Sequence, residues 1–128
     1  MTNNWDGLSV LVADDSAEVQ ESLARTYENL GFKVAGFASN GIEVMEQLDD
    51  LKPDLVSLDV IMPEMDGIEC FRKIQEREDP PKCLIVSALS KEPRIISHYA
   101  EEIHPDLYVR KPVAEDDLMK KLSLLFTD

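Results

Sequence analysis

The sequence predicts an α/β protein in which a doubly wound parallel β-sheet carries helices on both faces. Two patterns support this class. Short apolar runs with a bias toward β-branched residues alternate with longer segments whose apolar residues recur at helical spacing. The links between these segments are short, which is typical of helices that cross back to start the next parallel strand of one sheet.

The composition is that of one globular domain, and we expect residues 1–128 to form a single domain with no separate output domain. The chain has no apolar run of about 18 residues, the minimum for a membrane span. Its first residues, MTNNWDG, lack the basic and apolar regions of a signal peptide. Cys70 and Cys83 form no C-x-x-C pair, so we interpret them as reduced packing residues and expect a cytoplasmic protein.

The chain is also strongly acidic, with a formal net charge of −13 at pH 7. Such a surface repels the phosphates of nucleic acids and anionic lipid head groups, so we expect neither of them as a partner. It suits instead a basic protein partner, or a site that takes up a cation.

Five apolar segments are predicted as strands, because each is short, rich in apolar or β-branched residues and bounded by polar or turn-forming residues. In chain order these segments are SVLVA (Ser9–Ala13), KVAGFA (Lys33–Ala38), DLVSLD (Asp54–Asp59), CLIVSA (Cys83–Ala88) and DLYVR (Asp106–Arg110).

Two helices are predicted in the first half of the chain. Apolar residues recur at helical spacing from Val19 to Leu30, and Gly31 is typical of a helix end. The residues from Ser39 to Gly41 can open a second helix, and Pro53 breaks it.

Three helices are predicted in the second half. One follows Gly67, with its apolar face between Ile68 and Ile74. A weaker pattern covers Pro93–Ile103. The last helix begins near Ala114, and its acidic first turn, Glu115 to Asp117, favours the positive end of the helix dipole.

The polar residues of interest stand where the predicted strands end. Asp14 and Asp15 follow the first strand, Asp59 ends the third, Ser87 ends the fourth and Lys111 follows the fifth. The carboxyl ends of parallel strands meet at one edge of a sheet, where such folds bind ligands. We therefore expect three carboxylates, one hydroxyl and one ammonium group to share that edge.

This set of groups suits phosphoryl chemistry with a hard divalent cation. Carboxylates that crowd together repel one another, and Mg²⁺ prefers such oxygen ligands together with waters and a phosphate. On this interpretation Asp14 and Asp15 hold the metal, and Asp59 is the nucleophile that forms an aspartyl phosphate. Lys111 and Ser87 would hold oxygens of the transferred group.

The motifs VLVADDS, DLVSLDVIMPEMDG, LIVSAL and YVRKP, in this order and each at a strand end, resemble the receiver domains of two-component response regulators. The resemblance runs from about Leu8 to about Phe126. It implies a flavodoxin-like fold, with five parallel strands in the order 2-1-3-4-5. It also implies a role for each matching position. These are Asp14 and Asp15 as metal ligands, Asp59 as phosphoacceptor and further metal ligand, Ile61 as a metal ligand through its backbone carbonyl, Ser87 as switch hydroxyl, Tyr108 as switch aromatic, Lys111 as phosphate contact, Pro112 as the proline of a cis bond, and Pro63 and Gly67 in the loop beside the site.

The resemblance implies a signalling switch rather than an enzyme that turns over a substrate. The donor would be a sensor histidine kinase or a histidine phosphotransfer protein, and the ion Mg²⁺, with Mn²⁺ as an alternative. The surface formed by the fourth helix, fifth strand and last helix would then change for an unidentified protein target. The family also implies a monomer or a weak dimer that depends on phosphorylation.

Three departures from the common receiver pattern carry expectations of their own. Ser87 stands where threonine is frequent, and it keeps the hydroxyl. The segment EEIHPD, Glu101–Asp106, is bulkier than the small pair of many receivers, which bears on the movement of Tyr108. Ile61 and Leu89 are aliphatic at positions that tune hydrolysis in the family, so we expect slow self-dephosphorylation.

Several alternatives remain open at this point. Asp15, taken alone, can be the N-cap of the helix that follows it, and so can Ser16. A phosphatase with an aspartate nucleophile needs a second acid two residues later, where Ile61 stands. A flavin site needs a phosphate loop rich in Ser, Thr and Gly, whereas ADDSAEV offers acids. The remaining alternative is a receiver-like interaction module that acts without phosphorylation.

Overall fold

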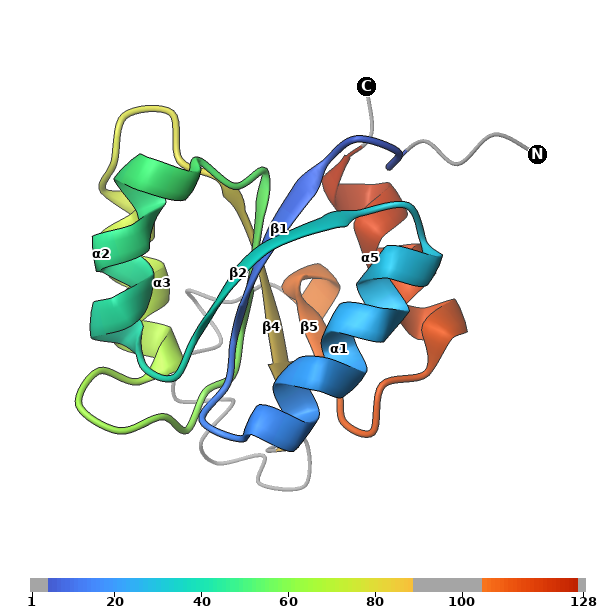
Figure 1. The fold of residues 1–128 in the computed structure, drawn as a ribbon, viewed down its shortest axis with the longest axis horizontal. Coiled ribbons are helices and arrows are strands. Elements are labelled where there is room, and N and C mark those ends of the chain that lie inside the picture. Colours follow the sequence, from blue (N-terminus) through green and yellow to red (C-terminus); the bar gives the residue numbers. More distant parts are fainter. Residues whose placement is uncertain (1–4, 89–104, 127–128) are drawn as a thin grey trace.

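The computed structural model describes residues 5–88 and 105–126. Five parallel strands form one sheet in the order β2-β1-β3-β4-β5 (Figure 1). This confirms the predicted class, parallel sheet and strand order. The strands are β1 (Ser9–Ala13), β2 (Lys33–Ala38), β3 (Leu55–Leu58), β4 (Lys82–Ser87) and β5 (Tyr108–Arg110).

Helices lie on both faces of the sheet. Helices α1 (Ala17–Asn29) and α5 (Glu115–Leu125) cover one face, and α2 (Gly41–Leu51) and α3 (Gly67–Gln75) cover the other (Figure 1). The helix predicted at Pro93–Ile103 lies outside the described residues. No helix in the described ranges combines the length and apolar content that a bilayer span requires.

Each strand separates two cores, because its side chains alternate between the two faces. Val10 and Val12 pack with α1 and α5, whereas Leu11 and Ala13 pack with α2 and α3. All four residues of β3 are buried. Strands β1 and β3 are therefore packed on both faces of the sheet. This packing sets the positions of their last residues, at the carboxyl-terminal edge of the sheet.

The bounds of three predicted strands were wrong. The predicted fourth strand, Cys83–Ala88, lies one residue too far along the chain, since β4 runs from Lys82 to Ser87. The predicted fifth strand, Asp106–Arg110, is a 3₁₀ turn over Pro105–Leu107 followed by the shorter β5. Pro105 has a fixed φ and no N–H, which suits the start of a helical turn better than a ladder. The predicted third strand, Asp54–Asp59, loses its two end residues, although the Asp59 N–H still donates to the Ala13 carbonyl at 3.0 Å.

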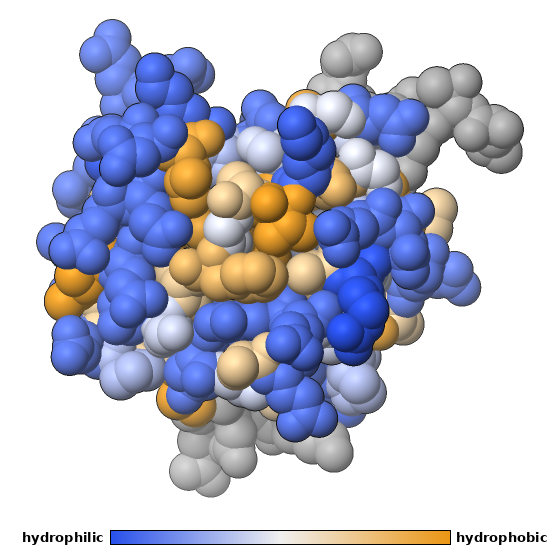
Figure 2. All heavy atoms as spheres, viewed as in Figure 1, coloured by the Kyte–Doolittle hydropathy of each residue, from blue (hydrophilic) through white to orange (hydrophobic). Residues whose placement is uncertain are grey.

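Strand β2 forms one edge of the sheet, and its pairing with β1 is irregular. Val10 lies opposite Val34, but Leu11 lies opposite Gly36, so Ala35 is an extra residue in a β-bulge. Hydrophobic side chains gather in the middle of this side of the molecule, between hydrophilic helices (Figure 2). The side-chain amide of Gln47, on α2, donates to the backbone carbonyl of Phe37 at 3.0 Å.

Candidate functional site

The predicted polar residues meet at the carboxyl-terminal edge of the sheet. Asp14 follows β1, Asp59 follows β3, Ser87 ends β4 and Lys111 follows β5. Asp14, Asp59 and Ser87 are buried, and only Ser57 shares that state among the polar residues of the described part. Buried polar groups persist where other groups compensate them, so this edge is a candidate site.

The loop between β1 and α1 places Asp14 and Asp15 in different surroundings. The N-cap of α1 is Ser16, whose side-chain oxygen accepts from the Val19 N–H at 3.3 Å. Asp14 Oδ1 accepts from the Ser16 N–H at 2.9 Å, which fixes the turn. Asp15 is exposed, and no hydrogen bond of its side chain is seen among the described residues. The prediction left open whether Asp15 or Ser16 caps the helix, and the structure assigns the cap to Ser16.

The loop after β3 places Asp59 by close backbone contact with α3. The Gly67 N–H donates to the Val60 carbonyl at 2.9 Å. A Cβ atom at position 67 would lie 2.0 Å from the backbone oxygen of Asp59, well inside van der Waals contact. Only glycine lets α3 begin this close to the candidate phosphoacceptor.

Replacement of Gly67 with alanine is therefore expected to push the end of β3 away from α3. We expect a loss of about 2 kcal/mol in the free energy of unfolding, together with a marked fall in phosphoryl uptake. Urea unfolding and intact-mass analysis would measure the two effects. Gly7→Ala is the control: a Cβ there meets nothing within 4 Å, although φ is +87°. It should cost about 1 kcal/mol and leave uptake unchanged.

One ammonium group, that of Lys111, faces two buried carboxylates at the site, those of Asp14 and Asp59. The Lys111 ammonium forms an ion pair with Asp14 Oδ2 and lies 3.5 Å from Asp59 Oδ2. Burial raises the pKa of the Asp59 carboxyl, and the neighbouring Asp14 raises it further. Lys111 and the hydrogen bonds from the Ser87 hydroxyl and the Val60 N–H act in the opposite direction. One lysine thus compensates two buried acids only in part.

The three acids fit a hard divalent cation. Asp14, Asp15 and Asp59 each offer a carboxylate oxygen, and these oxygens lie within 4.8 Å of one another. Mg²⁺ takes such oxygen ligands and keeps several waters, whereas Zn²⁺ prefers nitrogen or sulfur ligands. The exposed Asp15 leaves one side of the group open to water and to a phosphate.

The predicted switch residues adjoin this group. The Ser87 carbonyl accepts from the Tyr108 hydroxyl and from the Lys111 N–H, each at 3.0 Å. The Lys111–Pro112 peptide bond is cis, as the resemblance implied. Ile61 lies beyond the end of β3 with 60% of its surface exposed, and Leu89 lies outside the described residues.

Sequence reasoning missed one residue at this site. Gln20, on α1, donates from its side-chain amide to the backbone carbonyls of Asp14 at 2.7 Å and Ala38 at 3.2 Å. The available signal was weak: a long polar residue four positions after the N-cap, on the side of the helix nearest the acids.

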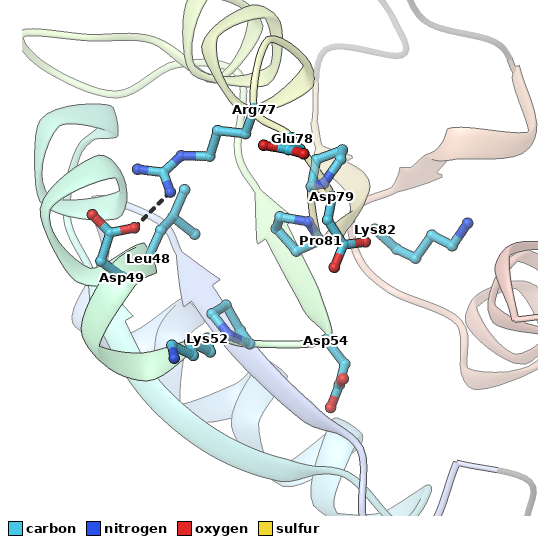
Figure 3. A pocket seen from close by; sticks show the side chains of 11 residues that line it. Leu48, Asp49, Lys52, Asp54, Arg77, Glu78, Asp79, Pro81 and Lys82 are labelled. Carbon is cyan, nitrogen blue, oxygen red and sulfur yellow. Dashed lines mark hydrogen bonds and ion pairs between the residues drawn. The ribbon is translucent and has the colours of Figure 1, made fainter.

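A cavity of about 500 Å³ lies away from this edge, between the C-terminal ends of α2 and α3 (Figure 3). It contains none of the predicted site residues. Three of its charged groups bond to other groups of the protein: Arg77 pairs with Asp49 at 2.7 Å, and Asp54 accepts from the Ser9 N–H at 2.8 Å. A second cavity, of about 420 Å³, is lined by α1 and by Lys111 and Pro112.

Comparisons with known proteins agree with this geometry. The family model of the response regulator receiver domain matches residues 10–123. The chemotaxis protein CheY of Thermotoga maritima is 37% identical over 90 residues, which are 70% of this chain and 75% of that protein. The CheX-CheY-BeF3-Mg+2 complex from Borrelia burgdorferi has a chain with TM-score 0.82 and 26% identity, covering 96% of this chain and 92% of that one. The response regulator domain of Thermotoga maritima CheB has TM-score 0.70 and 31% identity, covering 92% and 90%.

Proposed function

The chain belongs to the response regulator receiver domain family, and from this premise we propose that it is a phosphoryl-accepting switch with Asp59 as the acceptor. The observation that carries the proposal is the convergence of Asp14, Asp15 and Asp59 around one point beside Lys111. The donor is a phosphohistidine on a sensor kinase or phosphotransfer protein, or a small acyl phosphate.

In the transfer step, an Asp59 carboxylate oxygen attacks phosphorus and forms a new P–O bond. The bond between phosphorus and the donor breaks, and the donor keeps its electron pair: an imidazole nitrogen then takes a proton, and an acyl phosphate leaves as a carboxylate. The attacking group must be the ionised carboxylate of Asp59. Lys111 and the Ser87 hydroxyl favour this charged form, against burial and Asp14, which raise the pKa of Asp59.

The transferred group brings negative charge, and the site meets it with donors already in place. Lys111 can move its ammonium from Asp14 and Asp59 to a phosphoryl oxygen, and the Ser87 hydroxyl can donate to another. Asp14, Asp15, Asp59 and the Ile61 carbonyl would hold Mg²⁺, or Mn²⁺, which would supply positive charge beside the transferred oxygens. The Mg²⁺ in the complex of the Borrelia burgdorferi relative supports this assignment.

The signal would leave the site through Ser87 and Tyr108. When the Ser87 hydroxyl turns to the phosphoryl group, its carbonyl, which accepts from the Tyr108 hydroxyl, is displaced with it. Tyr108 then changes position on β5, beside α5. This is a local charge event that biases an element with two arrangements, and a downstream protein binds one of them.

The proposal extends to the setting of the protein. The net charge of −13 argues against nucleic acid and anionic membranes as partners of this domain. Cys70 and Cys83 are free and buried, which is consistent with reduced thiols in the cytoplasm. We propose one receiver domain that acts as a monomer or as a weak dimer after phosphorylation, and that does not turn over a substrate.

Incubation with acetyl phosphate tests the function directly. In the presence of Mg²⁺ we expect a mass gain of one phosphoryl group, and after Mg²⁺ is removed with EDTA we expect uptake at least about 100-fold slower, because the acids then repel the incoming anion. Intact-mass analysis would measure both rates. A folded protein that takes up no phosphoryl group from acetyl phosphate or from any of a panel of phosphorylated histidine proteins would favour the interaction module that acts without phosphorylation.

Self-dephosphorylation is expected to be slow. The Ile61 side chain is exposed but aliphatic, so it offers no polar group that could orient a water for attack on phosphorus. The phosphorylated protein should therefore decay over minutes or longer, and Ile61→Asn should speed decay by about tenfold. Decay of the mass-shifted species after removal of the donor measures this. Decay of the unaltered chain within seconds would contradict the expectation, and Ile42→Asn, on α2, serves as the exposed control.

A further inference from the structure

The turn that carries Asp14 and Asp15 is held by a residue outside the receiver motifs. The Gln20 side chain reaches back from the first turn of α1 to the ends of β1 and β2. Its backbone N–H donates to the Ser16 carbonyl at 2.9 Å, so the start of α1 is fixed on the same loop. The amide orientation is determined, because both partners are carbonyl oxygens and only an N–H can serve them.

The Asp14 carbonyl, to which Gln20 donates, belongs to the peptide unit between Asp14 and Asp15. Rotation of that peptide unit would turn the Asp15 side chain away from Asp14 and Asp59. The other bonds of Asp14 are made by its N–H, to the Ala38 carbonyl at 2.9 Å, and by its side chain. Among the described residues, the Gln20 amide is the group seen to bond the Asp14 carbonyl oxygen.

We infer that Gln20 is a positioning residue for the metal site. By holding the Asp14 carbonyl and the end of β2 together, it fixes the direction in which Asp15 presents its carboxylate. Asp15 depends on this more than Asp14 does, since its own side chain is exposed and makes no bond seen in the described part of the chain. The inference rests on the proposed function only in assuming that these acids bind a divalent cation.

Substitution of Gln20 tests the inference with Mn²⁺ alone as the probe, counting free Mn²⁺ by electron paramagnetic resonance. Gln20→Met keeps the length and loses the donor. We expect its dissociation constant for Mn²⁺ to rise about tenfold, the usual loss when a group behind a metal ligand is removed. Gln20→Lys restores a donor and should bind within about threefold of wild type. An effect of charge alone would instead make the lysine variant the weaker of the two.

The matched control is Gln47→Met. Gln47 also donates to a carbonyl of β2, that of Phe37, and no hydrogen bond from it to the loop between β1 and α1 is seen among the described residues. Both methionine variants should lose some stability in urea, and only Gln20→Met should lose Mn²⁺ affinity.

A folded Gln20→Met that binds Mn²⁺ as wild type does would overturn the inference. If Gln20→Met does not fold, the lysine variant decides. A folded Gln20→Lys with a tenfold loss of Mn²⁺ affinity would overturn the inference, and a folded Gln20→Lys with an affinity near that of wild type would support it. Wild type that binds no Mn²⁺ would refute the proposed metal site itself.

Discussion

Asp59→Asn is expected to abolish phosphoryl uptake, because an amide oxygen is a poor nucleophile and carries no charge to offer the metal. Intact mass after acetyl phosphate and Mg²⁺ should show no gain, a loss of at least about 100-fold in rate. Asp50→Asn, at an exposed position on α2, is the matched control and should be phosphorylated as wild type is. Uptake by the Asp59 variant at the wild-type rate would place the acceptor elsewhere.

The same substitution is expected to stabilise the protein while it removes the function. Burial and Asp14 raise the pKa of Asp59, so the folded protein binds the proton more tightly than the unfolded chain does. The ionised form therefore opposes folding at neutral pH, and this penalty grows as the pH rises from the unfolded pKa through the folded one. Asparagine removes the charge, so the midpoint of thermal unfolding at pH 7 should rise. Mg²⁺ should raise the midpoint of wild type more than that of the variant.

Lys111→Met should have the second large effect, and its size should depend on the metal. The Lys111 and Asp14 side chains are only 18% and 2% exposed, so removal of the lysine leaves a buried carboxylate without its cation. We expect a loss of about 3 kcal/mol in the free energy of unfolding when EDTA is present. Saturating Mg²⁺ should recover most of it, since the ion supplies the missing charge.

In Lys111→Met, the affinity for Mg²⁺ and the rate of phosphoryl uptake should change in opposite directions. Without the competing ammonium, the acids should bind Mg²⁺ about tenfold more tightly, which corresponds to about 1.4 kcal/mol. Phosphoryl uptake should nevertheless fall at least about tenfold, because the transferred oxygens lose a donor. Urea unfolding with and without Mg²⁺ and intact mass measure these effects, with the exposed Lys82→Met as control. An equal loss of stability in both conditions would show that the lysine acts through packing and not through charge.

The main features of the site follow from the sequence because two simple rules fix them. Apolar runs of strand length must be buried, and the ends of parallel strands must meet at one edge. The positions of Asp14, Asp59 and Ser87 follow from those rules without any knowledge of side-chain contacts. Their confirmed placement depends little on the details that separate one receiver from another.

The details that escaped prediction depend on contacts that have no pattern in the sequence. Gln20 acts on backbone carbonyls, which every residue has, so no partner residue signals its role. Asp15 and Ser16 are both good N-caps, and the sequence pattern does not choose between them; the structure shows the Ser16 side chain accepting from the Val19 N–H. The turn at Pro105–Leu107 replaces two strand residues, because local proline geometry prevails over an apolar pattern.

The irregular pairing of β2 has a consequence for the protein at high concentration. The free side of an edge strand is a template on which another chain can add its own strand, and long regular edges lead to aggregation. Here the extra residue at Ala35 breaks the regular spacing of the outward backbone groups, and Gln47 already occupies the Phe37 carbonyl. A strand of another molecule therefore cannot form a continuous ladder of hydrogen bonds with β2 beside the exposed Phe37. Strand β2 is thus a poor site for intermolecular extension of the sheet.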